Sequence, residues 1–192
     1  MLIATIAVII ALAIFIIGTG YLVALYNRIV RRENEIDNAY GSIEANLKKR
    51  HDLIPNLISS VKQYMDYESD TLQQIVELRN MARSDDLSTK KQEEIESQIT
   101  QALDKLMVQV EDYPDLKASE NFIQLQRSLN EVEEQLSASR RFFNSAVKQF
   151  NDSIETFPGN VIAALFDFSS REMFNAEVHE HKTPDVGSLL DN

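Results

Sequence analysis

Cysteine and tryptophan are absent from this chain of 192 residues, and glycine and proline are scarce, with five and four copies. The absence of cysteine excludes disulfide frameworks, thiolate metal sites and cysteine nucleophiles. So few turn-forming residues favour long helices with few connections over many short strands. The formal net charge of -11 argues against a nucleic-acid backbone as the main partner.

Charged side chains are also missing from the first 27 residues, MLIATIAVIIALAIFIIGTGYLVALYN. About 20 apolar residues cross the hydrocarbon core as a helix, so residues 1–27 are predicted to be a transmembrane anchor that contacts lipid through residues 2–26. The alternative is a cleaved signal peptide, which needs a basic start and a shorter apolar stretch. The helical pattern continues past the apolar run without a break, which favours the anchor.

Basic residues follow the apolar run and predict its orientation. The positive-inside rule places the chain after the anchor in the cytoplasm and the N-terminus outside. Residues 28–50 hold six basic and four acidic side chains, whereas the rest of the chain is strongly acidic. Basic side chains near a membrane attract anionic headgroups by about 1 kcal/mol each, so we expect a basic collar at the membrane surface. The collar residues are Arg28, Arg31, Arg32, Lys48, Lys49 and Arg50.

A seven-residue repeat of large apolar side chains predicts a long helix late in the chain. Its narrow apolar stripe is typical of a coiled coil or an antiparallel bundle, and core packing is favoured over a ligand pocket. Shorter periodic segments at 72–78 and 95–110 predict two further helices. The predicted bundle-core residues of the long helix are Phe122, Leu129, Leu136, Phe143, Phe150 and Phe157.

Prolines mark the boundaries between the predicted helices. Pro114 separates two helices, and Pro158 ends the long helix after Phe157, so the apolar piece 161–168 is predicted to fold back over an end of the core.

Pro55 allows two interpretations. Either Asp52 caps a new helix with Pro55 in its first turn, or one continuous helix is kinked at Pro55; the apolar stripe stays in phase across the proline, which favours the kink.

Amphipathic helices with short connections must bury their stripes against one another. The sequence therefore predicts an all-α fold in which an N-terminal transmembrane helix continues into an antiparallel four-helix bundle. We expect residues 28–174 to form the cytoplasmic bundle. The polar residues 175–192 are predicted to be disordered, or ordered only on a partner.

Four stretches of the sequence resemble the LemA family of bacterial membrane-anchored proteins. They are YNRIVRRENEIDNAYGSIEANLKKR, RHDLIPNLISSVKQYMDYE, EDYPDLKASENFIQLQRSLNEVE and RRFFNSAVKQFNDSIETFPGN, in that order along the chain. The resemblance implies an inner-membrane, single-pass protein with a cytoplasmic bundle and no established catalytic residues. It also implies an architectural motif, made of Asp52, Pro55, Asn56, Pro114, Asp115, Leu116 and Pro158.

Candidate chemistry is sparse. His51 is predicted to be a helix-surface residue rather than a catalytic base, because no hydroxyl nucleophile pairs with it. His179 and His181 in the tail lack the spacing of a two-histidine metal motif, even with Glu177 and Asp185 nearby. The acidic pairs at 85–86, 93–94 and 133–134 are predicted to be solvated, because Glu-x-x-His motifs are missing. We expect no cofactor and no metal.

Three functions fit these features. The favoured hypothesis is a non-enzymatic, membrane-anchored module for protein interaction or scaffolding, binding a protein partner or its own copies. The alternative is a membrane-shaping or organelle-assembly factor, since the resemblance extends to proteins associated with organelles of magnetic bacteria. An enzyme on a bundle scaffold is the least favoured. The resemblance also points to a membrane-protease or envelope-protein partner.

Overall fold

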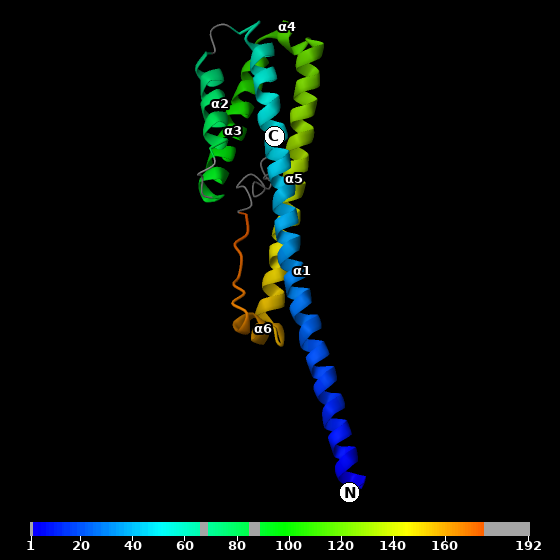
Figure 1. Ribbon diagram of the computed structural model, residues 1–192. Coiled ribbons are helices and arrows are strands. Elements are labelled where there is room, and N and C mark those ends of the chain that lie inside the picture. Colours follow the sequence, from blue (N-terminus) through cyan, green and yellow to red (C-terminus); the bar gives the residue numbers. More distant parts are fainter. Residues whose placement is uncertain (1, 66–68, 85–88, 175–192) are drawn as a thin grey trace, which may run out of the picture. The chain divides into compact units, whose positions relative to one another are not determined.

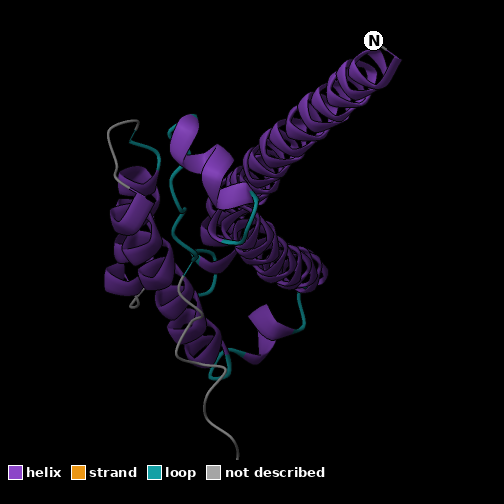
Figure 2. Ribbon diagram, turned by 90° about the horizontal axis from the view of Figure 1, so that it is seen from below, coloured by secondary structure: helices purple, strands orange, loops and turns teal. Residues whose placement is uncertain are grey.

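The computed structural model describes residues 2–65, 69–84 and 89–174. Within these ranges the regular structure is entirely helical (Figure 2), so the prediction of an all-α fold is confirmed. The described residues group into two compact units. Unit 1 takes its described residues from Met1–Tyr40 and Arg140–Asn192, and unit 2 takes them from Gly41–Ser139. The helices are α1 (Leu2–Val61), α2 (Ser69–Ala82), α3 (Thr89–Val110), α4 (Pro114–Lys117), α5 (Glu120–Glu155) and α6 (Gly159–Leu165) (Figure 1).

Helix α1 begins with the charge-free apolar run, and the side chains of residues 2–24 are all exposed. A helix packed in a protein core would bury such side chains, whereas a bilayer-spanning helix presents them to lipid. The start of α1 is long and apolar enough to cross a membrane. From Ile29 onward the same helix buries one face every three or four residues, as an amphipathic helix in a bundle does.

Pro55 lies inside α1, and the helix continues through it to Val61. The interpretation in which Asp52 caps a new helix is therefore wrong. Ile54, Leu57 and Ile58 on either side of Pro55 are all buried, because an uninterrupted helix keeps the apolar stripe in register. Pro55 itself is exposed, so its ring meets solvent rather than the core.

Unit 2 is an antiparallel bundle. The last third of α1, then α2, α3 and the first half of α5 run in alternating directions (Figure 1), and α2 and α3 pack side by side. Its apolar core includes Leu57 of α1, Ile75 of α2, Ile99 of α3 and Phe122 of α5. The short helix α4 starts at Pro114, buries Leu116 completely and leaves Asp115 exposed.

Unit 1 contains the start of α1, the end of α5, α6 and an extended segment at 166–174. Its aromatic rings pack closely: Tyr40, Phe143 and Phe174 form one group, and further along Phe168 contacts both Tyr26 and Phe150. Large apolar and aromatic groups therefore fill this interior, and each ring pair adds about 0.5–1.5 kcal/mol beyond its buried area.

Five of the six predicted heptad core residues lie inside, and these five all belong to α5. Phe122, Leu129, Leu136, Phe143 and Phe150 are each at most 9% exposed. Phe157 is 82% exposed, so its predicted place in the core is wrong. The reason is that α5 ends at Glu155, and a repeat of seven positions stops predicting a face once the helix stops.

Glycine is required at the turn from α5 into α6. A Cβ on Gly159 would come within 1.9 Å of the Ser153 carbonyl oxygen, which is backbone and has no room to move. Pro158 occupies the N-cap position of α6. Pro158 and Gly159 therefore bring α6 tightly back against α5, and Ile162 and Ala163 become buried.

Candidate functional site

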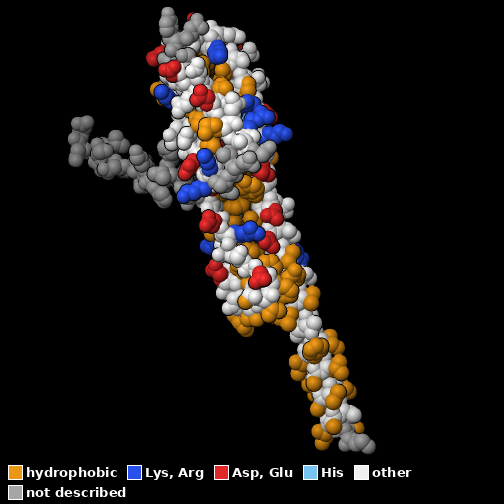
Figure 3. Space-filling view, turned by 60° about the vertical axis from the view of Figure 1, so that its left-hand side comes forward, with side chains coloured by type: hydrophobic (Ala, Val, Ile, Leu, Met, Phe, Trp, Pro, Cys, Tyr) orange, Lys and Arg blue, Asp and Glu red, His pale blue; other side chains and the backbone are white. Residues whose placement is uncertain are grey.

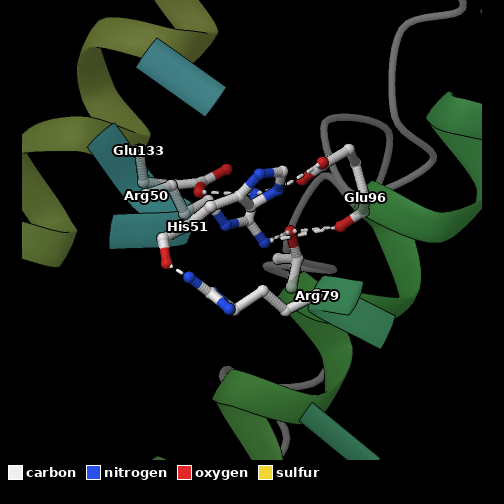
Figure 4. Close-up of polar contacts among 6 residues, drawn as sticks. Arg50, His51, Arg79, Glu96 and Glu133 are labelled. Carbon is white, nitrogen blue, oxygen red and sulfur yellow. Dashed lines mark hydrogen bonds and ion pairs between the residues drawn. The ribbon is translucent and has the colours of Figure 1, made fainter. Parts of the chain in front are cut away.

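The side chain of Arg50 lies inside unit 2, where it is only 1% exposed (Figure 4). Its place in the predicted membrane-surface collar is therefore wrong. Arg50 follows Leu47 by three positions and precedes Ile54 by four, so helical spacing puts it on the buried stripe of α1. Because Arg50 ends a run of three basic residues at 48–50, the sequence suggested one continuous exposed surface. Its neighbours Lys48 and Lys49 are exposed.

The guanidinium of Arg50 reaches both α3 and α5. Its Nη2 donates to Thr100 Oγ1 at 2.7 Å and to the Glu96 carbonyl oxygen at 3.4 Å. Its Nη1 lies 3.3 Å from Glu133 Oε2 and 3.7 Å from Glu96 Oε2. One cation therefore links three helices of unit 2. The predicted solvation of Glu133 is wrong in part, because this carboxylate is 41% exposed but ion-paired to Arg50.

His51 is also buried, at 6% exposure, and its predicted surface position is wrong. Its Nε2 lies 2.7 Å from Glu96 Oε1. An ionised carboxylate only accepts hydrogen bonds, so an Nε2–H of His51 is the donor to ionised Glu96 in this contact. Glu96 thus receives two neighbours of α1, Arg50 and His51, on its two oxygens (Figure 4).

Pro55 supplies the structural reason for a further contact. Proline lacks the N–H that would bond to the carbonyl four residues earlier, which here belongs to His51. The Nε of Arg79, on α2, donates to that carbonyl oxygen at 2.7 Å. A side chain from another helix therefore replaces the hydrogen bond that the proline removes.

The cluster formed by Arg50, His51, Glu96 and Glu133, called here the charge cluster, is not fully hydrogen-bonded. Among the described residues, Arg50 Nε, Arg50 Nη1 and Glu96 Oε2 are buried without a hydrogen bond. Removing charges from water costs several kcal/mol per ion, and imperfect geometry repays this only in part. The charge cluster is therefore weak evidence for net stability, and we expect its main role to be in selecting which helices pack together.

The hydrogen bonds within the charge cluster limit the catalytic chemistry that it could perform. An imidazole bound to a carboxylate is a base held in one orientation, as in hydrolase triads. The nearby hydroxyl, on Thr100, is held by Arg50 and donates to the Glu96 carbonyl at 3.2 Å. That donation leaves it no proton for an imidazole to take. The arrangement fits the joining of helices better than nucleophilic chemistry.

Metal binding has no support in the part of the chain that the structure describes, where no three His, Cys, Asp or Glu side chains are placed to hold an ion. The tail histidines His179 and His181 lie outside the described residues. The same holds for Asp85 and Asp86.

An open cleft on unit 2 is lined by two exposed residues of the architectural motif, Asp52 and Asn56. Asp52 and Asn56 of α1 point into it one turn apart, and Glu131 of α5 faces them. Lys49 Nζ donates to Gln135 Oε1 at 3.4 Å, and Gln135 Nε2 donates to Glu131 Oε1 at 3.1 Å. The full lining is Lys49, Asp52, Leu53, Asn56, Ser128, Glu131, Val132 and Gln135. Hydrogen-bonding groups around two apolar side chains make this cleft a candidate docking surface for a polypeptide.

Two asparagines of α5 hold the extended segment 166–174 in unit 1. Asn144 donates to the Phe174 carbonyl at 3.0 Å and accepts from the Phe174 N–H at 2.8 Å. Asn151 makes the same pair with Arg171, at 3.0 and 2.9 Å. Sequence reasoning missed both residues. The available signal was their spacing of seven, which places two amides on one helical face beside the apolar stripe.

The remaining collar residues lie where water or headgroups can reach them. Arg28 and Arg31 are exposed, and Arg32 is half-buried beside Glu35, with 2.7 Å between Arg32 Nη1 and Glu35 Oε2. Arg31 Nε donates to the Asn27 carbonyl at 3.2 Å. The membrane-surface role of Arg28, Arg31, Arg32, Lys48 and Lys49 stays a prediction.

Comparison with known proteins adds a family and several relatives. The LemA family model matches residues 39–187. Protein LemA of Metamycoplasma hominis is 31% identical over 179 residues, which cover 91% of this chain and 82% of that protein. Magnetosome protein MamQ 2 of Paramagnetospirillum magneticum is 32% identical over 73 residues, 38% of this chain and 27% of that protein. Magnetosome protein MamQ of Magnetospirillum gryphiswaldense is 28% identical over 74 residues, with the same shares.

Proposed function

Because this chain belongs to the LemA family, we propose that it is a non-enzymatic, membrane-anchored helical-bundle module that binds other proteins or further copies of itself. The observation that carries the proposal is α1, which starts as an exposed apolar helix long enough to span a membrane and continues without interruption into the bundle. Whatever binds the bundle is thereby held at the membrane.

The proposed location is the cytoplasmic (inner) membrane of a bacterium, with the N-terminus outside and the bundle in the cytoplasm. The support is the exposed basic pair Arg28 and Arg31 directly after the apolar run. Since the chain has no cysteine, a single cysteine at exposed Asp104 tests this orientation. We expect an impermeant maleimide to label Asp104→Cys only after the cells are opened. Labelling in intact cells would contradict the orientation.

The cleft lined by Asp52 and Asn56 is the proposed docking surface for a partner protein. The experiment is affinity purification of the full chain from native membranes, comparing wild type with two variants that make the same chemical change. Asp52→Lys alters the cleft, whereas Asp104→Lys alters an exposed position on α3 outside it. We expect a defined partner with wild type and Asp104→Lys, and its loss with Asp52→Lys.

Two other results of this purification would change the proposal. Recovery of no defined protein and no further copies would contradict the interaction proposal itself. Retention of the partner by Asp52→Lys, with loss on deletion of residues 175–192, would move the docking site from the cleft to the tail. A membrane protease or another envelope protein is the class of partner expected from the family resemblance.

A membrane-shaping or organelle-assembly role is the second candidate, favoured by the likeness to the magnetosome proteins. It requires self-association and lipid contact through the exposed basic residues. Reversing Arg28, Arg31, Arg32, Lys48 and Lys49 to Glu should then abolish vesicle deformation by the reconstituted chain. Arg50 is left unchanged in this variant because it is buried. Wild-type chain that leaves vesicles undeformed would eliminate this candidate.

A further inference from the structure

Four large apolar side chains are exposed together at the turn from α5 into α6 and along α6. Phe157 is 82% exposed, Val161 51%, Leu165 73% and Phe166 51%. Val161 and Leu165 are four positions apart and share one face of α6, while Ile162 and Ala163 face the interior of unit 1. These four residues are called here the α6 patch.

The α6 patch adjoins the part of α1 where the apolar run ends. The rings of Tyr26 and Phe166 are 4.7 Å apart. Tyr21, Leu25 and Arg28 of α1 line a cleft of about 360 Å³ together with Phe157 and other residues of the turn. Figure 3 shows hydrophobic side chains gathered at the end of the body from which the apolar helix emerges. The patch is therefore continuous with the lipid-facing surface of α1 rather than isolated on a polar face.

The length of the apolar run places the patch at a defined depth. Tyr21 is the first residue of α1 that lines the cleft, so residues 2–20 extend beyond it. At 1.5 Å per residue these nineteen residues span about 28 Å, close to the hydrocarbon thickness of about 30 Å. When they fill the hydrocarbon core, Tyr21, Tyr26 and the α6 patch reach the membrane–water interface, where aromatic side chains are favoured.

The polar groups of the same cleft match the headgroup layer. Arg28 and Arg32 line it together with Asp152, and Arg32 also pairs with Glu35, so exposed Arg28 is the cation best placed to meet a headgroup. Lipid phosphates at the interface complement an arginine guanidinium, which bonds them in two-pronged fashion. Apolar side chains next to arginines are the composition of an interfacial anchor.

We propose that the α6 patch inserts into the interface of the membrane that α1 spans, so that unit 1 holds the bilayer at two adjacent points. This inference rests on the proposed anchoring by α1. The occupant of the patch is a lipid surface rather than a second copy of the chain, because the patch is continuous with a helix whose exposed side chains are themselves suited to lipid. A second contact stops unit 1 from rotating freely about the axis of α1.

The test uses spin labels on single cysteines in the full chain, reconstituted in vesicles of phosphatidylcholine and phosphatidylglycerol. Oxygen concentrates in the bilayer and a nickel chelate stays in water, so the ratio of the two relaxation effects reports depth. Leu165→Cys probes the patch. Ile10→Cys is the control inside the span, and exposed Asp37→Cys, on α1 about 24 Å beyond Tyr21, is the control in water.

We expect the Leu165 label to be accessible to oxygen and at least several-fold less accessible to nickel than the Asp37 label. Phe157→Cys should behave in the same way, and it replaces a turn residue whose ring is already exposed, so the result does not depend on packing within α6. Agreement of the two positions supports insertion.

Three outcomes would overturn the inference. Nickel accessibility at Leu165 and Phe157 equal to that at Asp37 means that the patch lies in water. Labels shielded from both reagents mean that protein, such as a second copy, covers the patch. In both cases a lipid-exposed Ile10 label leaves the proposed anchor intact, whereas a water-exposed Ile10 label removes the anchor and the inference together.

Discussion

Units 1 and 2 are both built on α1 and α5, but each completes its interior differently. Unit 2 adds two further helices, α2 and α3, and places the charge cluster among them. Unit 1 adds only the seven-residue α6 and the extended segment 166–174, and fills the space with aromatic rings. The polar contacts between the helices of unit 2 are mainly between side chains. In unit 1, Asn144 and Asn151 join side chains to the backbone of segment 166–174, and Arg171 also pairs with Glu33.

The difference follows from where backbone hydrogen bonds are made. A helix satisfies its own N–H and C=O groups, so a helix added to a bundle can be specified only through its side chains. An extended segment has unpaired backbone groups, and an asparagine side chain offers one donor and one acceptor to match them. Asn144 and Asn151 do this in unit 1. Unit 2 also has side-chain donors to backbone: Arg79 binds the His51 carbonyl that Pro55 leaves free, and Arg50 donates to the Glu96 carbonyl oxygen.

The largest effect is expected from breaking the charge cluster. Glu96→Ala leaves Arg50 buried without its buried anionic neighbour, and we expect a loss of about 3–5 kcal/mol in the free energy of unfolding. Urea unfolding of the full chain in detergent micelles, followed by circular dichroism, measures the loss. The apolar double variant Arg50→Met with Glu96→Leu should recover most of it. A Glu96→Ala variant as stable as wild type would contradict the structural role of the cluster.

We expect Arg79 to contribute to stability because Pro55 leaves the His51 carbonyl without its backbone donor. Arg79→Leu leaves the His51 carbonyl without its charged donor, at an expected cost of about 1.5–3 kcal/mol in the free energy of unfolding. Pro55→Ala restores a backbone N–H at the right position, so the same Arg79→Leu change should cost clearly less in that background. The double-mutant cycle, measured by urea unfolding, tests the link. Equal costs in the two backgrounds would show that Arg79 acts independently of the proline.

The asparagine contacts should affect unit 1 alone. Asn151→Ala removes two hydrogen bonds to Arg171, each worth about 0.5–1.5 kcal/mol, so the free energy of local opening should fall by about 1–3 kcal/mol. Hydrogen exchange read by mass spectrometry should show faster exchange at 166–174 and unchanged exchange in α3. Asn34→Ala, at an exposed position of α1 in unit 1, is the matched control. Equal acceleration in α3 would contradict the separation of the two units.

The smallest effect is expected at an exposed ion pair. Arg32→Gln breaks the contact with Glu35, and because both side chains are partly solvated we expect a change of about 0–1 kcal/mol in the free energy of unfolding. Measuring Arg32→Gln and Glu96→Ala in the same urea experiment compares the free energy of unfolding lost at a surface ion pair with that lost at a buried one. A loss as large as that of Glu96→Ala would mean that exposure does not separate the two kinds of pair.

Most of the fold could be predicted from the helical spacing of apolar residues. The spacing of Leu129, Leu136 and Phe143 predicted the buried face of α5, and the run before Arg28 predicted the exposed apolar start of α1. The prediction failed at Phe157, because periodicity does not mark the residue at which a helix ends. It failed at Arg50 and His51 because charged and polar residue types are rarely buried, although helical phase places both on the buried stripe after Leu47.

The sequence by itself determined that the chain is helical, that it begins with a helix able to span a membrane, and which faces of α5 turn inward. These are local properties, set within one or two turns by hydrophobic spacing and by the absence of charge. Only the tertiary structure decided that Arg50 meets Glu96 and Glu133, and that Arg79 binds the carbonyl freed by Pro55. Those partners are 28 to 83 residues apart along the chain. A buried charge is tolerated only where folding brings its counterpart from another helix, and no pattern within one helix specifies that meeting.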